Sequence, residues 1–348
     1  MVIKKISLKN VGKLSTFSVN LENETYIVGR NATGKSTILK AILLLSGVST
    51  NTISRIPKLG IKENESVYIN CQIGFANEKT PVNLKLSLTK TVSGYKRKYF
   101  LNNMETVRSK INPFPAAVLF SPEVITFFSK SPDLRRNMII DFLKLMNPKF
   151  LKLWYKYKTI LRNRNKLLKS GYKNKEQIDY WSDRLLKEGL LLMMTLEDFI
   201  IQLSDALSEL SSKYLIKLYI CTKERFQNHL MDGFSRDVRV GYTTVGPHLF
   251  DIDLKYNNLS LVDFGSRGET KIGVMLILQA FCKIFYNDYK DYPILLLDDL
   301  ESELDELGLS TAGDLLKNPN QQKIITILTN KKKLIAPKGD AKIVNIDN

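Results

Sequence analysis

The sequence predicts an α/β protein in which a mixed sheet surrounds a phosphate loop and a helical arm is inserted into the chain. Residues Gly29–Thr37 fit the pattern G-x-x-x-x-G-K-[ST]. Ile294–Leu297 is an aliphatic run that ends in Asp298 and Asp299, as expected of a strand buried on both faces. Residues 133–212 have helical periodicity almost throughout.

The phosphate loop has the context that its chemistry requires. Thr25–Val28 is a short β-prone run and Ser36–Leu45 has helical length and apolar spacing, so the loop joins a strand to a helix. Backbone N–H groups and the helix N-terminus would surround the phosphates, Lys35 would reach the β- and γ-phosphates of ATP, and the Ser36 hydroxyl would bind Mg²⁺. The predicted nucleotide-binding residues here are Gly29, Arg30, Asn31, Ala32, Thr33, Gly34, Lys35, Ser36 and Thr37.

The paired carboxylates complete a hydrolytic site. At the carboxyl end of a buried strand, Asp298 would hold the magnesium and Asp299 would orient or deprotonate the attacking water. Together with Lys35 these are the predicted catalytic residues. An alternative interpretation is a turn or helix cap after a core strand, where aspartate is common.

A third element opens the apolar helical run that begins near residue 269. Ser266, Arg267 and Gly268 form a short turn, which could simply be a helix N-cap. A site built from both ends of a chain is the layout of an ABC/SMC-type ATPase head, and there this turn contacts the γ-phosphate bound by a second subunit. We therefore expect a homodimer in the presence of ATP, with Ser302–Asp305 crossing its interface.

Composition favours a DNA-binding protein of the reducing cytoplasm. The 348 residues carry a net charge of +17, which suggests a polyanionic partner. Three cysteines without a C-x-x-C pair argue against a disulfide framework or zinc. The N-terminus has no apolar signal region, and no apolar run approaches membrane-spanning length, so no membrane partner is expected.

The basic charge is concentrated in one helical segment. Between Leu151 and Lys175 there are nine basic residues and no acid, with Trp154 and three tyrosines interleaved. One face of this helix would be a basic stripe for DNA phosphates, and the alternative is a solvated helix face. The predicted DNA-binding residues are Lys152, Lys156, Lys158, Arg162, Arg164, Lys166 and Lys169.

These segments give a discontinuous domain organisation. Residues 1–117 and 239–348 are expected to form the ATPase domain, and 118–238 the helical, DNA-binding arm. In the arm, Leu192–Leu210 has a 4-3-4-3-4 apolar spacing typical of an antiparallel helical pair. Ile324–Leu328 is expected to be the last core strand.

With these residues in view, the chain resembles the RecF family over nearly its full length. The similarity rests on segments beyond the ATPase motifs, namely Phe120–Glu123, Arg162–Lys166, Tyr242–His248, Ser266–Gly268 and Leu297–Asp305. The resemblance implies an ATPase that recognises gapped DNA or junctions of single- and double-stranded DNA, works with a RecR-like mediator and supports RecA loading in gap repair. Alternatives are a RecF-like or overcoming-lysogenisation-type ATPase of a defence or other DNA-processing system, and an ATP-gated DNA clamp with negligible turnover.

The chain also departs from the family pattern. The family's N-F-R element is Asn10-Val11-Gly12 here, which removes an arginine and leaves Lys13 as a substitute. Glu269 replaces the glutamine that follows the serine turn. His248 has two interpretations, a packed structural histidine or a site residue.

Overall fold

The computed structural model describes residues 1–47, 65–75, 80–91, 94–111, 114–170, 175–231, 234–299, 317–329 and 341–346. The chain folds into two compact units. The first comprises Met1–Met146 and Leu261–Asn348, and the second is Asn147–Ser260. These boundaries differ from those expected at 117/118 and 238/239: the helices between 122 and 146 pack with the first unit, and the strands between 251 and 260 belong to the second.

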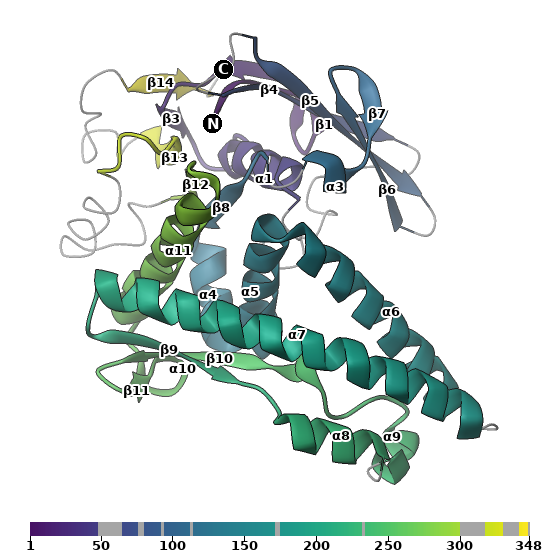
Figure 1. The fold of residues 1–348 in the computed structure, drawn as a ribbon. Helices are drawn as coiled ribbons and strands as arrows, with labels where there is room; N and C mark the ends of the chain where they lie inside the picture. The colour runs from purple at the N-terminus through teal and green to yellow at the C-terminus, as the bar shows by residue number, and fades with distance from the viewer. Residues whose placement is uncertain are drawn as a thin grey trace. The chain divides into compact units, whose positions relative to one another are not determined.

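An antiparallel sheet of six strands forms one layer of the first unit (Figure 1). Alternation of apolar and polar residues directs Val67, Ile69 and Cys71 into the core and leaves their neighbours on the other face. In spatial order the strands are β2 (Leu14–Asn20), β1 (Val2–Val11), β4 (Ser66–Gly74), β5 (Val82–Thr91), β6 (Gly94–Leu101) and β7 (Met104–Thr106).

A parallel sheet of five strands forms the other layer, and its aliphatic strands are largely buried. Its spatial order is β14 (Lys342–Asn345), β3 (Glu24–Gly29), β13 (Lys323–Leu328), β12 (Ile294–Leu297) and β8 (Ala117–Phe120). The expected strand at 324–328 is present as β13. It is not the last strand, because β14 follows and pairs with β3 at the sheet edge.

Six helices of the first unit are α1 (Lys35–Leu45), α3 (Arg108–Ile111), α4 (Pro122–Lys130), α5 (Pro132–Met146), α10 (Leu261–Phe264) and α11 (Arg267–Tyr289). The apolar helix α1 contacts both sheets, so it lies between the two layers (Figure 1). Helices α5 and α11 are joined by the stacked rings of Phe142 and Phe281, whose centroids are 4.1 Å apart. This packing holds α5 in the first unit.

The second unit is a helical hairpin with a small sheet, and Figure 1 shows its two long helices running in opposite directions. They contain the predicted antiparallel pair, and Leu192, Leu196 and Leu203 of its apolar series are fully buried. The elements are α6 (Pro148–Lys169), α7 (Lys175–Leu210), β9 (Tyr214–Tyr219), α8 (Lys223–Met231), α9 (Phe234–Val240), the 3-10 helix η2 (Pro247–Leu249), β10 (Asp251–Tyr256) and β11 (Leu259–Ser260).

Candidate nucleotide site and basic helix

The phosphate loop connects β3 to α1 with the geometry that its sequence predicts. Gly34, directly before α1, has φ +107°, a backbone conformation that disfavours other residues. A Cβ atom there would also lie 3.1 Å from the Leu14 side chain. The Lys35 ammonium donates to the carbonyl oxygens of Gly29 (2.6 Å) and Arg30 (2.7 Å), so it lies across the loop.

Asp298 meets the phosphate loop, although the two are far apart in sequence. The Ser36 hydroxyl donates to Asp298 Oδ1 at 3.1 Å, and the Asp298 side chain is largely buried. The parallel pairing of β3, β13 and β12 brings both strand ends to the same edge of the sheet. A hydroxyl and a carboxylate oxygen at this separation are suitable ligands for Mg²⁺, which prefers oxygen.

Thr326 on β13 is a residue of this site that the sequence analysis missed. Its hydroxyl donates to Asp298 Oδ1 at 2.7 Å and accepts the backbone N–H of Asp299 at 3.0 Å. It therefore fixes both aspartates at once, with Asp299 in a left-handed backbone conformation (φ +52°). The signal in the sequence was a single threonine within the aliphatic run Ile324–Leu328.

The phosphate loop and the two aspartates line an open cleft of about 440 Å³. Its position at the carboxyl ends of parallel strands is where α/β folds bind ligands. Lys13, in the turn between β1 and β2, also lines the cleft, as expected of a substitute for the missing family arginine. The lining residues are Gly12, Lys13, Asn31, Ala32, Gly34, Lys35, Ser36, Thr37, Asp298, Asp299 and Leu328.

The serine turn begins α11 as a capping box. Ser266 Oγ accepts the N–H of Glu269 at 3.2 Å, and the Glu269 carboxylate accepts the N–H of Ser266 at 2.8 Å. Glu269 thus fills the capping-box position that a glutamine can also fill, and as an acid in the first turn it complements the helix dipole. The turn remains accessible: Arg267 and Gly268 are exposed, and a Cβ atom on Gly268 would meet nothing within 4 Å. The expected interface segment Ser302–Asp305 lies outside the described residues.

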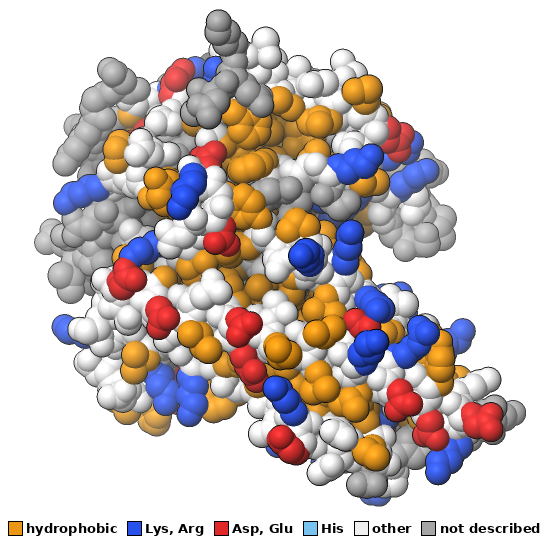
Figure 2. Space-filling view, viewed as in Figure 1, with side chains coloured by type: hydrophobic (Ala, Val, Ile, Leu, Met, Phe, Trp, Pro, Cys, Tyr) orange, Lys and Arg blue, Asp and Glu red, His pale blue; other side chains and the backbone are white. Residues whose placement is uncertain are grey.

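Six of the seven predicted DNA-binding residues lie on the exposed side of α6, and Figure 2 shows Lys and Arg side chains gathered along this helix. The exposed side chains are Lys152, Lys156, Lys158, Arg162, Lys166 and Lys169. Lys149, which is also exposed, extends the basic stripe by about one turn beyond the predicted residues. From Lys149 to Lys169 the stripe spans about 30 Å at 1.5 Å per residue. Lys156 pairs with Glu188 at 2.6 Å, so its positive charge is partly offset by that carboxylate.

The prediction that Arg164 binds DNA is wrong, because its side chain is fully buried and cannot contact a DNA phosphate. Its guanidinium donates to Asp237 Oδ2 (2.7 Å), Thr243 Oγ1 (2.6 Å) and Ser182 Oγ (2.9 Å), and thereby joins α6 to α7, α9 and the segment before η2. It points inward because residues 157, 160, 161 and 168 of the same helix are also buried. Its role is to hold the second unit together.

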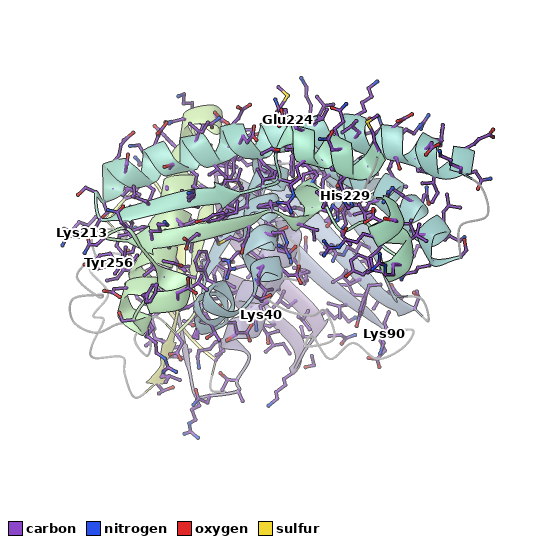
Figure 3. The ribbon with its side chains drawn as sticks, turned by 90° about the horizontal axis from the view of Figure 1, so that it is seen from below. Lys40, Lys90, Lys213, Glu224, His229 and Tyr256 are labelled. Carbon is purple, nitrogen blue, oxygen red and sulfur yellow. The ribbon has the colours of Figure 1, made fainter. Side chains whose placement is uncertain are left out.

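Both histidines of the chain belong to this buried cluster. His229, labelled in Figure 3, contacts Asp237 Oδ1 at 2.9 Å. His248 Nδ1 hydrogen-bonds to the Tyr157 hydroxyl at 2.8 Å, which is the packed structural role. Burial raises the pKa of Asp237, but hydrogen bonds from Arg164, His229 and Thr244 outweigh it and leave that pKa below its ordinary value. Each of the segments Arg162–Lys166 and Tyr242–His248 thus contributes side chains, such as Arg164 and Thr243, to the buried polar cluster of the second unit.

No helix among the described residues is long and apolar enough to cross a membrane. The family model described as the RecF/RecN/SMC N-terminal domain matches residues 2–344. The DNA replication and repair protein RecF of Clostridium beijerinckii is 28% identical over 321 residues, which cover 88% of this chain and 86% of that protein.

Two solved structures share the fold. The recombination mediator protein RecF with ATP, of the RecFOR pathway, matches with a TM-score of 0.85 and 22% identity over 99% of this chain and 96% of its own. The Smc head bound to the C-winged helix domain of ScpA matches with a TM-score of 0.50 and 21% identity over 95% and 90%. The family match, the fold and the phosphate-loop site agree, and the chain therefore belongs to the RecF/RecN/SMC N-terminal domain family of ATPases, as a divergent RecF-like member.

Proposed function

We propose that this chain is a DNA-binding ATPase of recombinational gap repair in the cytoplasm, which dimerises on ATP and acts at gapped DNA or at junctions of single- and double-stranded DNA. A RecR-like mediator as partner and support of RecA loading are part of this proposal, on the resemblance of the chain to RecF. The observation that carries the ATPase part is the convergence of Lys35, Ser36 and Asp298 in one cleft, with Thr326 holding Asp298 from behind by a hydrogen bond.

Each group has a defined task in this proposal. The phosphate loop and the N-terminus of α1 bind the phosphates, and Lys35 neutralises the β- and γ-phosphate charge. Ser36 and Asp298 would hold Mg²⁺, which supplies further neutralisation of the phosphates when bound. Asp299 orients or deprotonates the water, and Thr326 positions both carboxylates.

Nucleotide-dependent dimerisation tests the ATPase part. In sedimentation with ATP and Mg²⁺, Lys35→Ala should remain a monomer, because the phosphates lose their main cationic partner. Lys40→Ala is the matched control: it lies on the same helix, but it pairs with Glu123 at 3.3 Å and does not line the cleft. Equal dimer formation by both variants would refute the site.

The serine turn is proposed to act on the nucleotide of the other subunit. Ser266→Arg should leave nucleotide affinity of the monomer nearly unchanged but prevent closure. A mixed dimer with Lys35→Ala subunits has one site with both defects and one site with neither. Partial recovery of ATP hydrolysis is expected, and no recovery in verified mixed dimers would contradict the head-to-tail arrangement.

The DNA part is carried by the exposed side of α6. Replacing Lys156, Arg162 and Lys166 by glutamine should weaken binding to all duplex sequences alike and flatten the slope of log K against log salt by about 0.9 per lost contact. The control replaces Lys213, Lys217 and Lys223, which are exposed in the same unit but lie away from α6. An unchanged slope in the first variant, or the same change in both, would show that α6 is only a solvated face.

A further inference from the structure

The six-stranded sheet of the first unit has one buried face and one face that no described helix covers. Among the described elements, α1 packs on the core side, and Figure 1 draws no helix on the other side. Register identifies the outer face: Lys9, Tyr68, Ser87 and Lys98 are successive cross-strand neighbours on β1, β4, β5 and β6. Side chains of directly paired residues lie on the same face.

This outer face is predominantly basic. The register places five lysines on it, and among the described strand residues its one acid is Glu105, which pairs with Lys98 at 3.0 Å. The remaining positions are mostly small hydroxyl and amide side chains, such as Ser7, Asn70 and Thr89. The lysines are Lys5, Lys9, Lys85, Lys96 and Lys98. A surface with this balance suits a polyanion.

Two aromatic rings lie in the middle of the face, with a lysine between them. Lys85 Nζ is 4.8 Å from the ring centroid of Tyr68 and 5.7 Å from that of Phe100. Both rings are partly exposed. Tyr68 and Phe100 are two strands and two residues apart, which places their backbones about 12 Å from each other.

We infer that this sheet face binds single-stranded nucleic acid. Unpaired bases stack on Tyr68 and Phe100, and Lys85 with its neighbouring lysines contacts the phosphates between them, as aromatic side chains on a basic surface do for single strands. A duplex offers its phosphates but keeps its bases stacked inside, so it cannot use the two rings. The inference rests on the proposed function only in taking nucleic acid as the polyanion, and it assigns single strands to residues other than those of α6 that are proposed to bind duplex DNA.

The test compares a fluorescent oligothymidine with a blunt duplex. Tyr68→Leu with Phe100→Leu keeps apolar bulk but removes the ring faces, and it should weaken oligothymidine binding about fivefold or more with duplex binding unchanged. Lys85→Gln should flatten the single-strand salt slope by about 0.7. Tyr180→Leu, an exposed tyrosine of α7 in the second unit, is the control and should change neither.

Unchanged oligothymidine affinity in the double variant, or an equal loss for single strand and duplex, would overturn the inference. Wild-type protein gives an independent measurement that needs no stable variant. Photocrosslinking to an oligonucleotide containing 5-iodouracil should mark Tyr68 or Phe100, and crosslinks confined to other residues would overturn the inference too. Failure of the duplex test on α6 leaves these results interpretable, since they use different residues and a different ligand.

Discussion

Replacing Arg164 by methionine tests whether the buried ion pair holds the second unit together. The change removes three hydrogen bonds and leaves the Asp237 carboxylate buried without its cation. Loss of one partner of a buried pair costs about 3–5 kcal/mol. We expect the lower end, about 3 kcal/mol, because Asp237 Oδ1 keeps its contacts with His229 and Thr244.

The chain has a selective probe for this measurement. Its two tryptophans, Trp154 on α6 and Trp181 on α7, both lie in the second unit, so tryptophan fluorescence in urea follows that unit alone. With a urea m-value of about 2 kcal/mol/M, the midpoint of Arg164→Met should fall by about 1.5 M. Arg162→Met, the same change at an exposed position on the same helix, should shift stability by about 0.5 kcal/mol or less. Equal shifts in the two variants would refute the structural role of Arg164.

Three further predictions concern stability and the nucleotide site. Folding lowers the pKa of Asp237, so the ionised carboxylate stabilises the fold above its unfolded pKa of about 3.9, and this stabilisation is lost as pH falls through the folded pKa. Urea midpoints should therefore decrease between pH 7 and pH 3. The decrease should be smaller in Asp237→Asn, which has no carboxylate to protonate at this position. Thr326→Val should lower the ATP hydrolysis rate about tenfold or more by releasing both aspartates, and a wild-type rate would contradict its positioning role. Gly34→Ala should weaken nucleotide binding measured by calorimetry, because the backbone is left-handed there, whereas Gly268→Ala has open space and should bind normally; equal affinities would contradict the strain argument.

The parts of the nucleotide site that depend on a contiguous motif or on the end of a buried strand could be predicted from the sequence. The phosphate loop is contiguous, and a buried strand ending in carboxylates could be placed at the same sheet edge as that loop. Thr326 could not be assigned in this way. Its contact with Asp298 depends on the register of β12 and β13, and register is determined by packing between segments that sequence spacing does not relate.

Two predictions differ from the structure for other reasons, the DNA-binding role of Arg164 and the domain boundary at residue 118. Arg164 was assigned to DNA because it lies in a basic run, although its three- and four-residue spacing from Leu161, Ile160 and Leu168 predicts the buried side of α6. The expected arm boundary at residue 118 followed the change from strand to helix. Helical content does not determine which unit a helix packs against, and α4 and α5 pack with α11.

The neighbours of β3 in the parallel sheet determine the order in which the protein can fold during its synthesis. The strand that leads into the phosphate loop pairs on one side with β13 and on the other with β14, and both lie near the carboxyl end of the chain. At a synthesis rate of about 5–20 residues per second, β3 waits on the order of 15–60 s for its first partner in that sheet. The second unit, continuous from Asn147 to Ser260, emerges during this interval and can fold as a block. The nascent chain therefore gains a complete ATP cleft only after β12 and β13 have both been synthesised.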